Sequence, residues 1–494
     1  MVKIFLTLAT SAALVNTAWA QTAPSSGKTI TLNQKTVAEL VLKQSPMTAE
    51  VNLKYQQYRL DPVKALSAYD WKLLVESGFE YDKSASILTS TTQNTAKYER
   101  YRTTASLLKP FTTGTILGLE LSRLSQKTEI DGVPTTPPPG EQTLDSAGVT
   151  LEQSLLGNFL GVADRGTVNA AELTFQANTV ARANDLEEVV LSAIRQFWTA
   201  YVAQENFKES VNSRERYQKL VDAVKRKTSL GYSNPGDLPQ IQAEFETRVQ
   251  KVKTASVTYL QSMDKLATML ALEPGTEIKF EVPKDIPPVP KLPPKKVEDL
   301  RAIRSQKLRV DAAKESLTAA ESLSYPTLNF VGKMYSSGVD ESASGSYSQL
   351  TGGTRPKYYA GLKFQYNFGS DVQNETIINK KLTKDLEETR LSRQLSESTD
   401  SEAQAQRQVE ATYAIVQSAE KQKGFREKAS QELNRSYTQG RTDISVLITA
   451  MNNFFDSEVQ YSQAVGNYAV ALNEWAAVRD ELIPDDSGMN EYKK

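Results

Sequence analysis

The chain has 494 residues, with 58 Lys and Arg residues against 59 Asp and Glu residues. This balance gives no support for nucleic-acid binding, which needs a basic surface that displaces counterions. The chain has no Cys and no His, which excludes disulfides, thiolate metal sites and the Ser-His-Asp and Cys-His mechanisms. Carboxylate pairs and a Ser-Lys dyad remain open, but an enzyme is the weakest interpretation, and we expect no cofactor and no metal.

The N-terminus has the pattern of a secretory signal peptide over residues 1–20. A positively charged start precedes an apolar stretch over 4–15, and Ala18-Trp19-Ala20 fits the small-x-small cleavage rule. The alternative is a buried N-terminal helix. Cleavage after Ala20 would leave Gln21 first, which is not the Cys that an N-terminal lipid anchor requires. No later segment has the 18 or more apolar residues of a membrane helix, so the secreted chain is either soluble or a transmembrane β-barrel.

The first half of the mature chain, residues 21–280, begins with a helix and a group of strands. Helical spacing covers residues 36–69, and Pro46 and Pro62 should break or bend this segment. Four segments that follow are rich in β-branched, aromatic and alternating residues and are separated by Ser, Thr, Asn, Gly and Pro. They predict strands within residues 71–155, at 71–81, 102–108, 115–124 and 147–155.

A long helical hairpin is expected over residues 158–271. Helical periodicity runs as far as residue 230, which corresponds to about 105 Å at 1.5 Å per residue. Gly231 to Gly236 then forms a turn. The return helix keeps apolar residues close to 3-4 alternation for more than four heptads, which is typical of a coiled coil.

Residues 281–300 contain six prolines and join the two halves. We expect a packed, extended strap, with a flexible linker as the alternative. The second half, residues 301–483, has a helix over 297–323 and two strands within 325–368. These strands cover 325–335 and 358–368 and are separated by an exposed Ser- and Gly-rich loop at 336–353. A second hairpin over 371–482, with its turn at 440–443, precedes a short polar tail at 484–494.

The two halves are related by an internal duplication. Gly231 and Gly440 lie 209 residues apart, and the same spacing joins Leu238 to Leu447. This period is too long for a solenoid unit of about 20–50 residues. The halves differ in one respect, because the first has room for four strands and the second for two. The inserted strand pair lies around residues 102–124, and the sequence leaves open whether it enlarges a sheet or forms an external flap.

Three motifs occur in this duplicated frame. Tyr437 to Ala450 resembles the Tyr-x-x-Gly turn and Val-Leu-x-x-Ala helix start of the TolC family of outer-membrane efflux and secretion channels. Residues 230–238 are its first-half counterpart. Leu151 to Gly157 is similar to the strand-to-helix junction of many members. No single motif is diagnostic, but their order and duplication carry the resemblance over nearly the whole mature chain.

The resemblance implies an α+β membrane protein, a TolC-like homotrimer with a shared β-barrel in the outer membrane that is continuous with a long periplasmic α-barrel. The physics agrees, because a two- or four-stranded sheet cannot close alone and open edges are forbidden in lipid. It also implies a passive exit duct of a tripartite efflux or type I secretion system. A periplasmic adaptor would join the duct to an inner-membrane pump, which would supply the energy. The pump and the adaptor together would set the cargo specificity.

The resemblance places the functional residues at the periplasmic tip, in the two hairpin turns. Adaptor contacts would come from three residues in each turn, namely Leu230, Gly231 and Tyr232 in the first and Gln439, Gly440 and Arg441 in the second. Both glycines also suit the left-handed position that ends a helix.

The resemblance also implies a gate at the tip, with Asp237, Tyr437 and Asp443 as candidates. Asp237 is equally suited to stabilising the start of the return helix, and Arg441 could pair with either Asp. The chain departs here from the best-known members, whose second-half carboxylates after the glycine are replaced by Ser445, Ile448 and Thr449. This departure puts a cation-selective acidic entrance in doubt.

Two other functions remain open. A porin-like channel that works without a pump predicts many evenly spaced strands of about ten residues, whereas most of this chain has helical spacing. A structural periplasmic coiled-coil stalk predicts no alternating strands and leaves 358–368 unexplained. The duct is therefore the interpretation that accounts for both the strands and the helices.

Overall fold

The structure is a computed structural model that describes residues 29–483, except residues 90–91, 131–140, 233, 274, 284 and 370. The expected signal peptide and polar tail lie outside the described residues. Within them, no helix is both long enough and apolar enough to cross a membrane. The chain divides into two compact units, which we call the sheet unit (47–191, 290–411 and 471–494) and the helical unit (1–46, 192–289 and 412–470). Each unit takes segments from both sequence halves.

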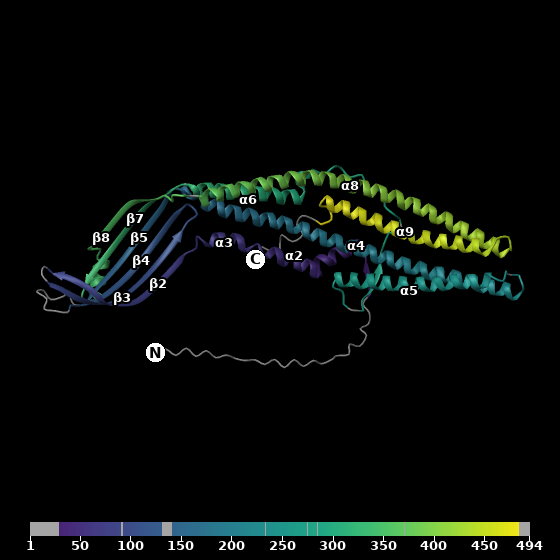
Figure 1. Cartoon of the computed structure of the whole chain (residues 1–494), viewed down its shortest axis with the longest axis horizontal. Coiled ribbons are helices and arrows are strands. Elements are labelled where there is room, and N and C mark those ends of the chain that lie inside the picture. The colour runs from purple at the N-terminus through teal and green to yellow at the C-terminus, as the bar shows by residue number, and fades with distance from the viewer. Residues whose placement is uncertain are drawn as a thin grey trace, which may run out of the picture. The chain divides into compact units, whose positions relative to one another are not determined.

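The sheet unit contains one antiparallel sheet of six strands in the order β2-β3-β4-β5-β7-β8 (Figure 1). The strands are β2 (Lys72–Thr89), β3 (Thr92–Pro110), β4 (Thr115–Ile130), β5 (Gln142–Leu156), β7 (Thr327–Asp340) and β8 (Pro356–Gln365). All six strands expected from the sequence are present, four from the first half and two from the second, and most are longer than their alternating cores. Since β5 pairs with β7, the strands of the two halves join in a single sheet.

The prediction of an exposed loop at 336–353 is wrong. Residues 336–340 continue β7, and α7 (Ala343–Thr351) follows. Ser342 caps this helix by accepting a hydrogen bond from the Gly345 N–H at 3.1 Å. The fully buried Ser346 donates its hydroxyl to the Gly338 carbonyl at 2.8 Å, which holds the helix against the sheet. Ser and Gly enrichment thus reflects a cap and a close approach here, rather than an exposed loop.

The segment expected to be helical at 36–69 forms three short helices. The first, α1 (Gln34–Gln44), lies in the helical unit, and α2 (Pro46–Gln57) and α3 (Leu60–Ser67) follow in the sheet unit. Pro46 begins α2 and Pro62 lies in the first turn of α3, as the missing N–H of proline favours. From the second half, η2 (Val297–Asp299) and α6 (Arg301–Ser324) replace the single helix expected over 297–323.

Two long helical hairpins carry the chain between the units. The first is α4 (Val162–Ser229) followed by α5 (Asp237–Met269), and the second is α8 (Asp371–Thr438) followed by α9 (Ile444–Val478). α4 and α8 have 68 residues each. α4 starts later than residue 158, because residues 157–161 form a turn that includes η1 (Phe159–Gly161).

The Pro-rich strap is hydrogen-bonded within each unit. In the helical unit, β1 (Thr29–Leu32) and β6 (Glu277–Phe280) form a parallel pair just before the strap, and the Tyr468 hydroxyl donates to the Pro287 carbonyl at 2.8 Å. In the sheet unit, the Arg479 guanidinium donates to the Pro293 carbonyl at 3.0 Å. These contacts favour the packed strap over the flexible linker.

Candidate functional site: the turns of the two helical hairpins

The two hairpin turns have the same backbone geometry. Gly231 and Gly440 each have φ of +74°, a value that side chains with a Cβ rarely adopt. After each glycine, a backbone N–H closes the helix end: Tyr232 donates to the Lys227 carbonyl and Arg441 donates to the Ser436 carbonyl, both at 2.9 Å. Nothing lies within 4 Å of a Cβ built at either glycine. Conformation rather than space therefore requires glycine at both positions.

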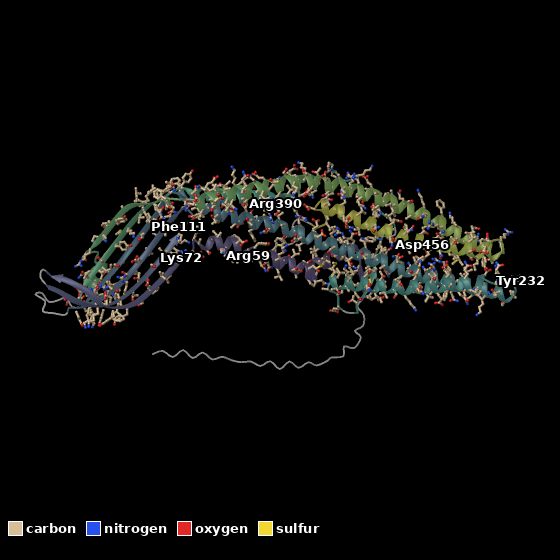
Figure 2. The ribbon with its side chains drawn as sticks, in the orientation of Figure 1. Arg59, Lys72, Phe111, Tyr232, Arg390 and Asp456 are labelled. Atoms are coloured by element: carbon tan, nitrogen blue, oxygen red, sulfur yellow. The ribbon has the colours of Figure 1, made fainter. Side chains whose placement is uncertain are left out.

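The six residues named for adaptor contact are exposed in these turns. Leu230 is 68% exposed and Tyr232 is 81% exposed, and Figure 2 shows Tyr232 at the end of the α4–α5 hairpin. Both side chains are therefore open to solvent in the single chain. The second turn offers the polar Gln439 and Arg441 instead.

Behind the turns, residues from all four helices form one hydrophobic cluster, which we call the tip core. Its buried members are Tyr217, Leu220, Val224, Ile241, Tyr437, Ile444, Leu447, Ile448 and Met451. Because each hairpin contributes to this core, apolar contacts join the two hairpins next to their turns.

Lys227 links the two hairpins at the tip. Its ammonium group donates to the Tyr437 carbonyl at 2.7 Å and lies 4.2 Å from the centre of the Tyr437 ring. The carbonyl belongs to the last turn of α8, where unpaired acceptors and the helix dipole attract a cation. The ring adds a cation–π contact. Lys227 was not predicted from the sequence, because the residues around it do not identify a partner 210 residues away.

The three gate candidates have different environments. Tyr437 is buried in the tip core, and burial raises the pKa of its hydroxyl, with smaller contributions from Asp237 and Asp443. Asp443 precedes α9 and accepts hydrogen bonds from the Ser445 hydroxyl and from the Ser445 N–H at 2.8 Å, which lowers the pKa of its carboxyl. Asp443, rather than Asp237, is therefore the N-cap of its helix.

Asp237 is the first residue of α5 and is largely buried. Its carboxylate accepts a hydrogen bond from the Asn234 N–H at 3.1 Å. Each of the two carboxylates thus stabilises its own turn. Among the described residues, neither forms an ion pair with Arg441, so the structure does not bring together the pair considered from the sequence.

A second polar contact between the hairpins lies below the tip core. Asn452 on α9 accepts a hydrogen bond from the Tyr217 hydroxyl at 2.5 Å and another from the Arg248 guanidinium at 2.6 Å. Arg248 is buried, and its guanidinium lies 5.1 Å from the Tyr217 ring centre and 5.4 Å from that of Phe455. The buried position of Arg248 could have been predicted from the sequence, because this residue lies seven residues after Ile241 on the stripe of α5 that packs inward.

Glu458 is a buried acid on the apolar stripe of α9. It forms a two-point ion pair with Arg216 of α4, with N–O distances of 2.6 Å and 3.2 Å. Burial raises the pKa of the Glu458 carboxyl to about 7, and Arg216 opposes this shift. Glu458 lies four residues after Phe454 and three before Tyr461, a position where the 3-4 alternation predicts an apolar residue. An acidic residue at an apolar position of the helix could therefore have identified this buried ion pair from the sequence.

We expect Glu458→Gln to remove a pH dependence of stability. The pKa of this acid is higher in the folded state than the usual unfolded value near 4.3, so between about pH 4.5 and pH 7 the folded state binds more protons and the free energy of unfolding falls as pH rises. Chemical unfolding of the wild type and of Glu458→Gln at pH 5.5 and pH 7.5 tests this. The wild type should lose more stability than the variant between the two pH values. Equal losses would contradict the raised pKa.

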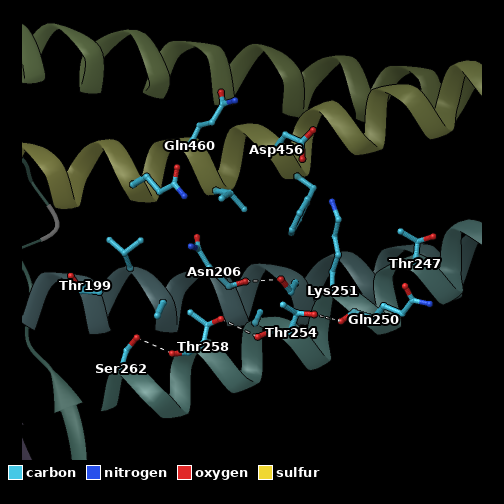
Figure 3. Close-up of a pocket in the computed structure, with 17 residues that line it drawn as sticks. Thr199, Asn206, Thr247, Gln250, Lys251, Thr254, Thr258, Ser262, Asp456 and Gln460 are labelled. Atoms are coloured by element: carbon cyan, nitrogen blue, oxygen red, sulfur yellow. Dashed lines mark hydrogen bonds between the residues drawn. The ribbon is translucent and has the colours of Figure 1, made fainter. Parts of the chain in front are cut away.

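An open groove of about 880 Å³ runs between α4, α5 and α9 in the helical unit (Figure 3). Its walls are mainly hydroxyl and amide side chains. Several hydroxyls are already bonded to their own helices: Thr254 donates to the Gln250 carbonyl at 3.2 Å and Ser262 to the Thr258 carbonyl at 2.8 Å. The polar side chains labelled in Figure 3 come from three helices and are spread along the groove. Within the described residues, no group of three or more acidic side chains is placed to hold a metal ion.

No family model and no curated protein matches the sequence. Solved structures do match the fold. A CusC structure, described in terms of conformational changes on folding and transmembrane channel formation, is 12% identical with a TM-score of 0.67, over 94% of this chain and 95% of that chain. The CmeC outer-membrane channel of Campylobacter jejuni is 13% identical with a TM-score of 0.68, over 92% and 86%. The open state of the MtrE outer-membrane channel of Neisseria gonorrhoeae is 13% identical with a TM-score of 0.65, over 91% and 89%.

The resemblance inferred from the motifs is therefore confirmed at the level of the fold. The chain has the fold of TolC-family outer-membrane channels over about 90% of its length. The similar structures are channel proteins rather than enzymes. At 12–13% identity these structures share the fold with this chain, and its function has to be argued from its own residues.

Proposed function

We propose that this protein is an outer-membrane channel that serves as the exit duct of a tripartite efflux or type I secretion system. The observation that carries the proposal is one apolar face of the six-stranded sheet that remains exposed in the single chain. Leu73 on β2 is 70% exposed and Leu362 on β8 is 66% exposed. A soluble protein rarely leaves such a face uncovered, whereas a sheet in lipid must present one.

The same proposal gives the assembly. Three copies share one barrel in the outer membrane, and their helical hairpins form the periplasmic part of the duct after removal of residues 1–20. A periplasmic adaptor contacts the turns through Leu230, Gly231 and Tyr232 and through Gln439, Gly440 and Arg441. The exposed apolar side chains of the first turn support this role. An inner-membrane pump then supplies the energy.

Planar-bilayer recording of protein purified from the outer-membrane fraction, with native mass spectrometry of the same sample, tests the proposal. A homotrimer with discrete ion-conducting events is expected. A protein found only as a soluble monomer, or a folded trimer that never conducts, would contradict it. Loss of substrate export from cells that lack the protein, but not of passive uptake, would separate an exit duct from a pump-independent channel.

The gate in this proposal is the Lys227–Tyr437 link, which holds the two hairpins together at the tip. A charged hydrogen bond with a cation–π contact contributes about 1–3 kcal/mol. We therefore expect Lys227→Met to raise the open-to-closed ratio about tenfold, since about 1.4 kcal/mol corresponds to a factor of ten. Single-channel recording measures this ratio.

Lys225→Met is the matched control, because Lys225 is exposed on the same helix. This variant should leave the open-to-closed ratio unchanged. An open-to-closed ratio of Lys227→Met equal to that of the wild type would contradict a role of this link in the gate. Asp443→Ala should instead weaken the start of α9, because the carboxylate of Asp443 accepts hydrogen bonds from Ser445.

A further inference from the structure

The inserted strand pair is part of the sheet and not a flap on it. β2 pairs with β3 from Lys72–Leu108 onward, β3 pairs with β4 over 15 residue pairs, and β4 pairs with β5 over 12. β2 and β5 are not neighbours in the sheet order. A flap formed by β3 and β4 would leave β2 beside β5, so the register excludes that arrangement for the single chain.

The turn of the inserted pair is held at the end of the sheet that faces the helices of the same unit. The Ser154 N–H donates to the Gly114 carbonyl at 3.0 Å, and the Gln153 amide donates to the Thr113 carbonyl at 3.2 Å. At the start of the sheet, Lys109 donates to the Tyr69 carbonyl at 2.6 Å. Figure 2 labels Lys72 and Phe111 at this same end. A flap would not need such contacts with the first and last residues of its neighbours.

The inserted strands also keep the two-sided pattern of the other strands. The directly opposed residues Ala105, Leu121 and Ala147 continue from Val75 on β2 and form one apolar face. The opposite face carries polar residues, such as the directly opposed Thr104, Ser122 and Ser146. Strands in a membrane wall alternate in this way, with apolar side chains toward lipid and polar ones toward water.

The sheet ends in two complementary edges. In the described part of the chain, β2 and β8 each have a single neighbouring strand. An unpaired edge in lipid leaves backbone groups without hydrogen bonds, which is costly. Because all five pairings are antiparallel, β2 and β8 run in opposite directions. The β8 edge of one copy can therefore continue the antiparallel sheet by pairing with the β2 edge of the next.

We propose that β3 and β4 widen the transmembrane wall, so that three six-stranded sheets close into an eighteen-stranded barrel in which β8 of each copy pairs with β2 of the next. This inference rests on the proposed trimeric duct and adds its width in the outer membrane. Barrels of 16–18 strands leave an aqueous channel.

Engineered disulfides test the pairing, and the natural absence of Cys provides a clean background. Leu362→Cys on β8 is combined in turn with Leu73→Cys, Val75→Cys and Ser77→Cys on β2, which samples the register along one face. Oxidation of outer-membrane fractions should give covalent dimers and trimers on non-reducing gels for at least one pair. A second variant, Val75→Cys with Ala105→Cys, joins directly opposed residues of β2 and β3 and should form a bond within one chain.

Leu362→Cys with Leu121→Cys on β4 is the matched control and should give no bond between chains. A bond there would show that β2 and β3 lie outside the wall and would overturn the proposal. Failure of Val75→Cys with Ala105→Cys to form its bond would overturn it as well. So would a trimer by native mass spectrometry without any β2–β8 bond, and that result would leave the duct function intact. A monomer by native mass spectrometry would instead contradict the proposed function itself.

Discussion

Gly161→Ala should prevent the sheet unit from folding correctly. Gly161 has φ of +76°, and a Cβ at this position would lie 1.9 Å from the Thr112 carbonyl oxygen. Both the positive φ and the collision oppose any side chain, and the obstacle is backbone that cannot rotate away. We expect a loss of more than about 4 kcal/mol of stability, at the extreme end for single substitutions. Thermal unfolding and the yield of folded protein in the outer-membrane fraction measure this loss.

Gly236→Ala is the matched control for Gly161→Ala. Gly236 has φ of −89°, and nothing lies within 4 Å of a Cβ built there. The variant should differ from wild type by about 1 kcal/mol or less. If Gly161→Ala also unfolds at the wild-type temperature, the close approach of the β3–β4 turn to the start of α4 is wrong.

Arg301→Ala should destabilise the sheet unit by about 3–5 kcal/mol, because it leaves a buried carboxylate without its partner. Arg301 and Glu187 are both almost fully buried, and their N–O distance is 2.9 Å. The pair also holds the segment that follows α9: Arg301 donates to the Ile483 carbonyl at 2.5 Å, and Glu187 accepts from the Leu482 N–H at 3.0 Å. Chemical unfolding of the purified variant measures the loss.

Three comparisons separate the ion pair from its surroundings. Lys307→Ala removes an exposed cation from the same helix and should change stability by less than about 0.5 kcal/mol. The double variant Glu187→Leu with Arg301→Met should recover most of the loss, because apolar groups of similar size need no partner. Burial raises the pKa of Glu187 to about 7. Arg301→Ala should therefore cost less at pH 6, where the carboxyl is largely protonated, than at pH 8. A loss that is the same for Lys307→Ala would contradict the role of the pair.

Features with a local cause were predictable from the sequence. The hairpins follow from apolar spacing along each helix, the strands from alternation, and the turns from glycines at fixed places. α8 spans Asp371–Thr438, so it begins at the expected residue and ends just before the turn expected at 440–443. The failures share another origin. The 336–353 segment looked polar, but α7 is held by contacts with β7 that the segment itself does not encode.

At the tip of the hairpins, too, features with a local cause were predictable and contacts between distant residues were not. Gly231 and Gly440 were recognisable because each ends its own helix in a left-handed conformation, and Asp443 lies beside the helix that it caps. Lys227 was not recognisable, because its acceptor is a backbone carbonyl of the other hairpin. A backbone carbonyl has no identity in the sequence.

The duplication, the helical hairpins, the number of strands and the two exposed turns could all be predicted from the amino-acid sequence. These depend on the conformational preferences of neighbouring residues and on periodic burial of apolar side chains. The neighbours of each strand, the place of the inserted pair inside the sheet and the side chains that link the hairpins were revealed by the folded chain alone. Those choices depend on groups far apart in the chain, whose pairing is selected by packing and by the need to satisfy backbone hydrogen bonds together.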